Sequence, residues 1–301
     1  MRKFVIIAVV VGLVVIVLLL LAMFFAGYIM TGKRQTLEEA FAWQTGRYDT
    51  SFYAEIEKND YEIESYDGYK IHVELLKNPE ESDKYIIISH GYTDNRMGAL
   101  KYAPMYLELG YNCVIYDLRG HGENEETFTT YGIREGKDIY ELVKDTRDRY
   151  ENIEQLGLHG ESLGAASTIT SLKYKPEVDF VVADCGFSDI NNVLKKGIKN
   201  AHMPGVVLGL ADIGARIRYH YSLKKMNPIE ALEKNEIPIL FIHGKEDDFI
   251  EPKNSKDMAE TTKGYKEIYL IDGAGHAESV LVAPDVYKEH VKKYLENINM
   301  R

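Results

Sequence analysis

Short apolar runs that alternate with helix-prone stretches constrain the fold of this 301-residue chain more than any other feature. Runs of this kind, bounded by glycine, are typical of strands buried in a sheet. Strands separated by helices need crossover connections, so a mostly parallel sheet is expected. The expected strands are Tyr85–Ser89, Asn112–Asp117, Leu156–His159, Phe180–Asp184, Ile237–His243 and Glu267–Ile271.

A hairpin is expected to precede these strands. Tyr61–Tyr66 and Tyr69–Leu76 alternate in polarity as strands do, and they flank Asp67-Gly68, a strong signal for a tight turn. An antiparallel hairpin that leads into parallel strands gives a mixed sheet, so the predicted fold class is α/β.

One interval breaks the alternation of strands and helices. About 50 residues separate the strand that ends at Asp184 from the strand near Ile237, too many for a single crossover helix. The interval, residues 187–236, contains an apolar run, Val206–Leu210, and a basic, tyrosine-rich segment, Arg216–Lys225. Ordered insertions of this size are usually functional, so we expect a small helical lid.

The N-terminus carries 26 residues, Val5–Met30, without one charged or amide side chain. A helix of that length spans about 39 Å, enough to cross a hydrocarbon core of about 30 Å. The alternative, a cleavable signal peptide, normally has an apolar region of about 7–15 residues and a small-x-small cleavage site, which this run lacks. We expect residues 1–30 to form an uncleaved, single-pass cell-membrane anchor, and residues 31–60 a polar, helix-prone connector.

Charge sets the expected location and partners. Two basic residues precede the apolar run and two follow it, so the positive-inside rule is nearly balanced. The free amino terminus favours an extracytoplasmic main domain, and a cytoplasmic one stays open. With 36 Lys and Arg against 47 Asp and Glu, the net charge is −11, which argues against nucleic acid as a partner. No feature fixes the oligomeric state.

The pentapeptide Gly160-Glu161-Ser162-Leu163-Gly164 directly follows an expected strand. A serine on a sharp strand-to-helix turn adopts strained backbone angles that expose its hydroxyl, and the flanking glycines remove Cβ atoms that would collide there. The setting predicts that Ser162 is a nucleophile; a glycine-rich turn with a passive serine is the alternative.

A serine nucleophile needs a base and an acid that orients the base. His276 follows the last expected strand in a glycine-containing loop, and Asp247 follows the strand before it, so both are expected at the edge of the sheet where Ser162 lies. The carboxylates that stay open as alternatives to Asp247 are Asp248, Glu246 and Asp184. The other histidines at strand ends, expected to support turns, are His90, His159 and His243.

Acyl transfer also needs donors for a developing oxyanion. Leu163, the first residue after the nucleophile, and Tyr92, in the loop His90-Gly91-Tyr92, are expected to supply backbone N–H groups. Here the alternative is an ordinary strand-to-helix loop.

These motifs together resemble the α/β-hydrolases, and most closely the membrane-anchored bacterial members grouped with lipase/esterase-like and serine-aminopeptidase-like hydrolases. The motifs are His90-Gly-Tyr92, Tyr116-Asp-Leu-Arg-Gly-His-Gly122, Gly160-Glu-Ser-Leu-Gly164, His243-Gly-Lys-Glu-Asp247 and Gly273-Ala-Gly-His276. The resemblance covers residues 61–301. It implies an eight-stranded sheet, a lid after strand six, a Ser162–His276–Asp247 triad and an oxyanion hole from Tyr92 and Leu163. One departure is Glu251, which stands between Ile250 and Pro252 where the family often has Ile-Pro or Val-Pro.

The function expected from this resemblance is a serine hydrolase that cleaves small-molecule esters with acyl or lipid-like groups through an acyl-enzyme on Ser162. A peptidase or amidase of the same fold, and a catalytically silent membrane-tethered binding protein, are the alternatives. No metal-ligand spacing and no phosphate-binding glycine loop is present, so no metal and no cofactor are expected.

Overall fold

The computed structural model describes residues 1–300 and contains one mixed sheet, in the order β1-β2-β4-β3-β5-β6-β7-β8. The hairpin strands β1 and β2 pair antiparallel, as do β2 and β4, and every other neighbouring pair is parallel. The predicted mostly parallel eight-stranded sheet is therefore confirmed. The strands are β1 (Lys58–Glu64), β2 (Lys70–Leu76), β3 (Lys84–Ser89), β4 (Asn112–Tyr116), β5 (Gln155–Glu161), β6 (Phe180–Asp184), β7 (Ile239–Gly244) and β8 (Lys266–Ile271).

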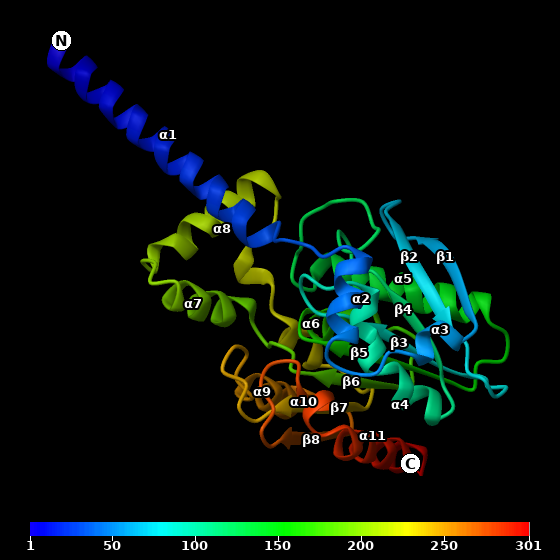
Figure 1. Cartoon of the computed structure of the whole chain (residues 1–301). Helices are drawn as coiled ribbons and strands as arrows, with labels where there is room; N and C mark the ends of the chain where they lie inside the picture. The colour runs from blue at the N-terminus through cyan, green and yellow to red at the C-terminus, as the bar shows by residue number, and fades with distance from the viewer. Residues whose placement is uncertain (301) are drawn as a thin grey trace. The chain divides into compact units, whose positions relative to one another are not determined.

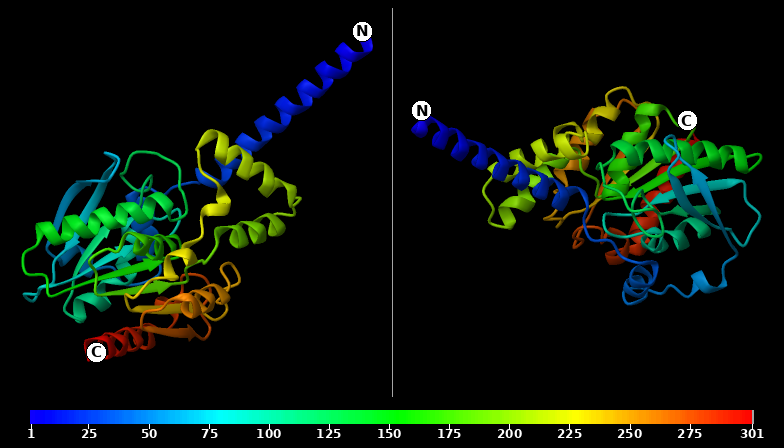
Figure 2. Two further views of the ribbon diagram at one scale, coloured as in Figure 1. Left: turned by 180° about the vertical axis from the view of Figure 1, so that it is seen from behind. Right: turned by 90° about the horizontal axis from the view of Figure 1, so that it is seen from above.

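Helices cover both faces of this sheet (Figures 1 and 2). Alternate side chains of a strand point to opposite faces, so Ile86 and Ile88 of β3 enter the core under α4 (Ala103–Glu108) and α11 (Pro284–Asn299). The other face carries α5 (Ile133–Arg149) and α6 (Leu163–Ser171), which pack against each other. Other helical elements of the same unit are η1 (Arg96–Lys101), η2 (Leu172–Tyr174), η4 (Pro228–Leu232), α9 (Lys253–Thr261) and α10 (Ser279–Val282), besides the two described below.

The compact unit that holds the sheet consists of Lys33–Asp189 and Asn227–Arg301 as far as the chain is described, so it begins before the expected boundary at residue 61. Residues of the expected connector form α2 (Leu37–Thr45) and α3 (Phe52–Glu55). Thr36 and Glu39 close a capping box at the start of α2, and Ala40 is fully buried in the core. The short apolar stripe of α2 draws this stretch into the unit.

A second compact unit consists of Met1–Gly32 and Ile190–Met226. It contains α1 (Arg2–Met30), α7 (Ile190–Asn200), α8 (Val206–Arg218) and η3 (Leu223–Lys225), and Figure 1 shows α8 crossing the end of α1. By its length and composition, α1 is long enough and apolar enough to cross a membrane. Residues 190–226 lie inside the interval where a helical lid was expected, and they are mostly helical.

Candidate functional site

Ser162 stands in the turn between β5 and α6, with φ 52° and ψ −113°. A Cβ on Gly160 would lie 2.5 Å from the backbone of Gly164, and a Cβ on Gly164 would lie 2.2 Å from the carbonyl oxygen of Ser89. Both glycines are therefore required by close backbone contacts. The Ser162 N–H donates to the Asp184 carbonyl oxygen at 2.9 Å, and this hydrogen bond ties the turn to the end of β6.

The side chains of Ser162, His276 and Asp247 form a continuous hydrogen-bonded chain. The Ser162 Oγ lies 3.0 Å from His276 Nε2, and His276 Nδ1 lies 2.7 Å from Asp247 Oδ2. Since a carboxylate only accepts hydrogen bonds, Nδ1 carries the proton and Nε2 is free to accept the hydroxyl proton of Ser162. The structure thus brings together the three residues that the sequence analysis had placed at one edge of the sheet.

Asp247 is buried and held in place by four donors. Its Oδ1 accepts the N–H groups of Phe249 and Ile250 at 2.9 and 2.8 Å, and its Oδ2 lies 3.1 Å from His243 Nε2. Burial alone would raise the pKa of this carboxyl, but the hydrogen bonds from His243 and His276 outweigh burial and lower it. Asp247 is therefore ionised at neutral pH, and the turn through Ile250 places the loop despite the inserted Glu251.

His243 supports a turn as expected, and it also contacts Asp247, which the sequence analysis did not anticipate. Its Nδ1 lies 2.7 Å from Ser255 Oγ, and its Nε2 lies 2.7 Å from the carbonyl oxygen of Ile250 as well as near Asp247. The imidazole thus fixes the position of the carboxylate that holds His276. The only available signal was its place four residues before Asp247 at the end of a strand.

The alternative carboxylates do not contact His276. Asp248 and Glu246 are exposed. Asp184 is fully buried, and its Oδ2 accepts the Tyr102 hydroxyl at 3.0 Å. Burial, followed by the nearby charge of Glu161, raises the pKa of Asp184 to about 6.

The loop His90-Gly91-Tyr92 runs beside the start of α6. A Cβ on Gly91 would lie 3.7 Å from the Cβ of Ser162, so the loop backbone borders the serine. The ring of His90 fixes the loop: its Nδ1 donates to the Gly91 carbonyl at 2.7 Å, and its Nε2 accepts the Leu118 N–H at 2.8 Å. Burial lowers the pKa of His90, in keeping with this neutral tautomer.

Leu163 directly follows Ser162, and Tyr92 directly follows Gly91, whose backbone borders the serine. Leu163 is the first residue of α6, and the N–H groups of the first helical turn have no partner within the helix. The Tyr92 ring lies 5.9 Å from the rings of both His121 and Tyr131, which holds the backbone of this loop in place. Both expected donor residues therefore lie next to Ser162 or in the loop that borders it.

A buried charged cluster lies behind Ser162, and the sequence analysis did not identify it. Lys101 forms an ion pair with Glu161, the residue before the serine, and Lys101 Nζ donates to the Ala277 carbonyl at 3.1 Å. The Tyr102 hydroxyl donates to Glu161 Oε2 at 2.7 Å and to Asp184. Lys101 thus joins the strand of the serine to the loop of His276. Burial would lower the pKa of Lys101, but Glu161 raises it.

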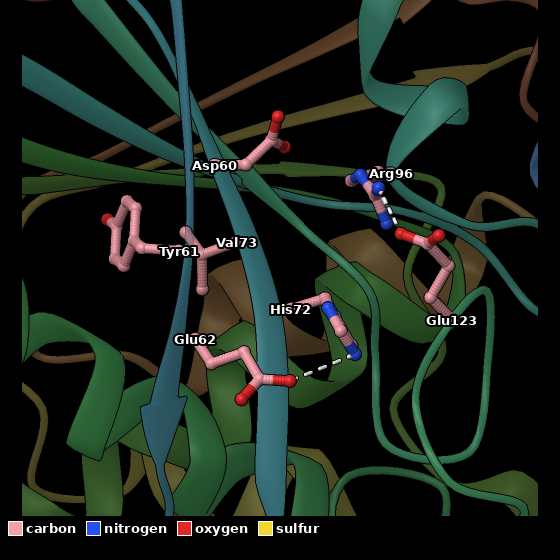
Figure 3. Close-up of a pocket in the computed structure, with 7 residues that line it drawn as sticks. All are labelled: Asp60, Tyr61, Glu62, His72, Val73, Arg96 and Glu123. Carbon is pink, nitrogen blue, oxygen red and sulfur yellow. Dashed lines mark hydrogen bonds and ion pairs between the residues drawn. The ribbon is translucent and has the colours of Figure 1, made fainter.

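A polar recess of about 410 Å³ lies along the hairpin and contains none of the predicted site residues. Glu62 and His72 face each other at 3.3 Å, and Arg96 pairs with Glu123 (Figure 3). Arg96 also bonds the buried Asp117. The charged groups of this recess are largely satisfied by one another, and none of them is a nucleophile.

The family comparison covers most of this site. A model of the prolyl oligopeptidase family matches residues 99–279. The protein YqkD of Bacillus subtilis is 30% identical over 305 residues, which cover 97% of this chain and 98% of that protein. Alpha/beta hydrolase domain-containing protein 17C of Homo sapiens is 24% identical over 239 residues, or 70% of this chain and 66% of that protein.

Solved structures share the fold. The esterase PF2001 of Pyrococcus furiosus superposes with a TM-score of 0.71 at 24% identity, covering 90% of this chain and 99% of that one. An esterase of Exiguobacterium antarcticum superposes with a TM-score of 0.58 at 18% identity, covering 78% of this chain and 98% of that one.

Proposed function

Because the chain belongs to the prolyl oligopeptidase family of the α/β-hydrolase superfamily, and is thus an enzyme of the α/β-hydrolase type, we propose that it is a serine hydrolase that cleaves carboxylic esters. The observation that carries the proposal is the hydrogen-bonded chain from Ser162 through His276 to Asp247. The acyl group of the substrate is transferred to Ser162, and water then releases it.

In this mechanism His276 Nε2 takes the hydroxyl proton of Ser162 as the serine oxygen attacks the carbonyl carbon. The developing oxyanion accepts hydrogen bonds from the backbone N–H groups of Tyr92 and Leu163. The imidazolium, stabilised by the ionised Asp247, then returns its proton to the leaving alcohol. In the second half of the cycle His276 takes a proton from water as the water oxygen attacks the acyl carbon. His276 then gives this proton to the Ser162 oxygen as the bond between that oxygen and the acyl carbon breaks, which releases the acid.

We propose that α1 is a membrane anchor and that the substrates are esters with acyl or lipid-like groups. A tether keeps the enzyme where amphiphilic substrates concentrate. Two proteins of similar structure, from Pyrococcus furiosus and Exiguobacterium antarcticum, are esterases, which supports the choice of esters.

The second candidate function is the cleavage of peptide or amide bonds, which the match to the prolyl oligopeptidase family favours. The same serine, base and oxyanion donors serve both reactions, since only the leaving group differs. His276 would then give its proton to an amine.

The test of the nucleophile uses the purified full chain in detergent with p-nitrophenyl esters and a fluorophosphonate probe. We expect Ser162→Ala to abolish probe labelling and to lower ester turnover by a factor of about 10³ or more. Ser279→Ala is the matched control, because Ser279 is also buried but lies outside the hydrogen-bonded chain. Equal turnover by the wild type and Ser162→Ala would refute the proposal.

A substrate panel separates esters from amides. The panel pairs p-nitrophenyl esters of increasing acyl length with aminoacyl-p-nitroanilides, each compared by kcat/KM. Higher kcat/KM for the acyl esters supports the first function, and higher kcat/KM for the anilides supports the second.

A further inference from the structure

The helix α1 has two different surfaces along its length. The residues from Arg2 to Leu21 are exposed, except for the half-buried Gly12. Ala22, Ala26 and Met30, in the last turns of the helix, are buried. Twenty helical residues span about 30 Å, the thickness of a hydrocarbon core. The part of α1 that is free of protein contacts therefore has the length that a membrane needs, and the packed part begins where the helix would leave it.

The packed part of α1 lies directly against α8. A Cβ on Gly214 of α8 would lie 2.0 Å from the carbonyl oxygen of Ala22, so the two helix backbones touch. A Cβ on Gly27 would lie 3.1 Å from the Arg218 guanidinium. Small residues that allow this close approach are typical of helices that pack at membranes. The position of α8 is thus fixed at the end of the proposed span.

The helix α8 is apolar on two sides. One side, with Val207, Ala211 and Ala215, is buried. The other side repeats apolar residues at positions 206, 210, 213 and 217, and Val206, Ile213 and Ile217 are 67%, 47% and 50% exposed. An apolar side of a helix that protein does not cover is typical of a helix that lies at a membrane surface. The second side has no protein cover within its unit.

The same segment is basic in an otherwise acidic chain. Residues 190–226 contain seven lysines and arginines against one acid, whereas the whole chain has a net charge of −11. Between α7 and the start of α8 lies a cavity of about 520 Å³. Lys195, Lys199 and His202 line it together with the apolar side chains of Ile198, Met203 and Leu208. A cationic and apolar lining complements an amphiphile with an anionic head group.

We propose that α7 and α8 dock on the surface of a membrane that contains anionic phospholipid. The exposed apolar side of α8 enters the boundary between head groups and acyl chains, while Lys195 and Lys199 contact lipid phosphates. The docking surface is continuous with the membrane span, because α8 packs on the last turns of α1. The inference rests on the proposed membrane anchoring by α1 and does not depend on the bond that the enzyme cleaves.

The test uses the full chain reconstituted in nanodiscs of phosphatidylcholine and phosphatidylglycerol in equal amounts. An environment-sensitive NBD group is attached at Ile213→Cys, since both native cysteines, Cys113 and Cys185, are buried. We expect blue-shifted emission and quenching by lipids that carry a nitroxide near the head group. The matched control is Glu260→Cys, an exposed position on α9, where we expect neither effect.

A label at Val14→Cys tests the anchor separately, and deep nitroxides should quench it. Quenching at position 14 without quenching at position 213 would overturn the docking surface while leaving the anchor intact; no quenching at position 14 would overturn the anchor and the docking inference with it. A basic residue near an anionic surface strengthens attraction about fivefold, so Lys195→Gln with Lys199→Gln should lower the ratio of docked to undocked protein about 25-fold. An unchanged ratio would exclude the proposed phosphate contacts.

Discussion

At the scale of single residues, Ser162 is surrounded by more buried charge than the proposed triad requires. Three charged residues near it are buried, namely Lys101, Glu161 and Asp184. Glu161 directly precedes the serine and pairs with Lys101, and the backbone carbonyl of Asp184 accepts the Ser162 N–H. Charges taken out of water are costly unless they are paired, so each of these groups depends on the others. Lys101 in particular holds Glu161 on one side and the carbonyl oxygen of Ala277, next to His276, on the other.

Removal of Lys101 should therefore leave Glu161 as an unpaired buried charge. We expect Lys101→Met to lower the free energy of unfolding by about 3 kcal/mol, measured by urea titration. It should also lower kcat, because the loop of His276 loses a donor. The double variant Lys101→Met with Glu161→Gln should regain most of the lost stability, since the isolated charge is gone. Equal stability of the single and double variants would show that the ion pair does not matter.

The raised pKa of Asp184 predicts how stability changes with pH. Its pKa of about 6 in the folded chain is above the ordinary value of 3.8, so the folded state binds the proton more tightly than the unfolded state. The stabilisation by the bound proton is complete below pH 3.8 and is lost as the pH rises through about 6.

Asp184→Asn mimics the protonated carboxyl. We expect this variant to be more stable than the wild type at pH 8, by up to about 3 kcal/mol, and of similar stability near pH 4. Urea titrations at both pH values measure the difference. The control is Asp248→Asn, which removes an exposed carboxylate and should alter neither value. A constant difference between wild type and Asp184→Asn at both pH values would contradict the assignment.

At the scale of elements, the strand-to-helix turn around Ser162 tolerates no side chain at Gly164. A Cβ there would lie 2.2 Å from the carbonyl oxygen of Ser89, and both partners are backbone. We expect Gly164→Ala to lower the free energy of unfolding by more than about 2 kcal/mol and to reduce esterase activity, because β3 and α6 must separate.

The matched substitution is Gly197→Ala in α7, where a Cβ meets nothing within 4 Å. Glycine inside a helix costs about 0.5–1 kcal/mol relative to alanine, so this variant should be slightly more stable than the wild type. Thermal unfolding of both variants checks the pair. Similar stabilities of the two alanine variants would show that the turn can open.

The elements themselves were largely predictable from the sequence, because strand runs such as Phe180–Asp184 are short, apolar and bounded by glycine or charge. The turn at Ser162 was predictable for the same local reason. Lys101 was not, since a lysine in a short helical stretch ordinarily faces water and nothing local indicates its contact with Glu161, 60 positions later. The packing of α1 on α8 likewise joins residues about 190 positions apart, and only the close approach of Ala22 and Gly214 in the fold reveals it.

At the scale of the whole molecule, the chain divides into a unit with the sheet and a unit that joins α1 to residues 190–226. The sheet unit has its own large core, in which Tyr106, Phe180 and Tyr294 are fully buried. The other unit has no comparable core, because the buried side of α8 packs on the last turns of α1. The two units should therefore respond differently to the loss of α1.

Deletion of residues 1–32 tests this difference. Without α1, Val207, Ala211 and Gly214 lose their cover, so residues 190–226 should open while the sheet unit stays folded. We expect trypsin to cleave first after Arg216, Arg218, Lys224 or Lys225, at a rate at least about tenfold above that of the full chain in detergent, and amide exchange to accelerate in the same segment. The thermal unfolding temperature of the sheet unit should shift little.

The variant Gly214→Val in the full chain tests the same contact without a deletion. The added side chain would collide with the backbone of Ala22 and displace α8, so this variant should show the same protease sensitivity. If residues 190–226 stay protected in both variants, α8 does not need α1 for its structure, and the small residues at their contact have no structural role.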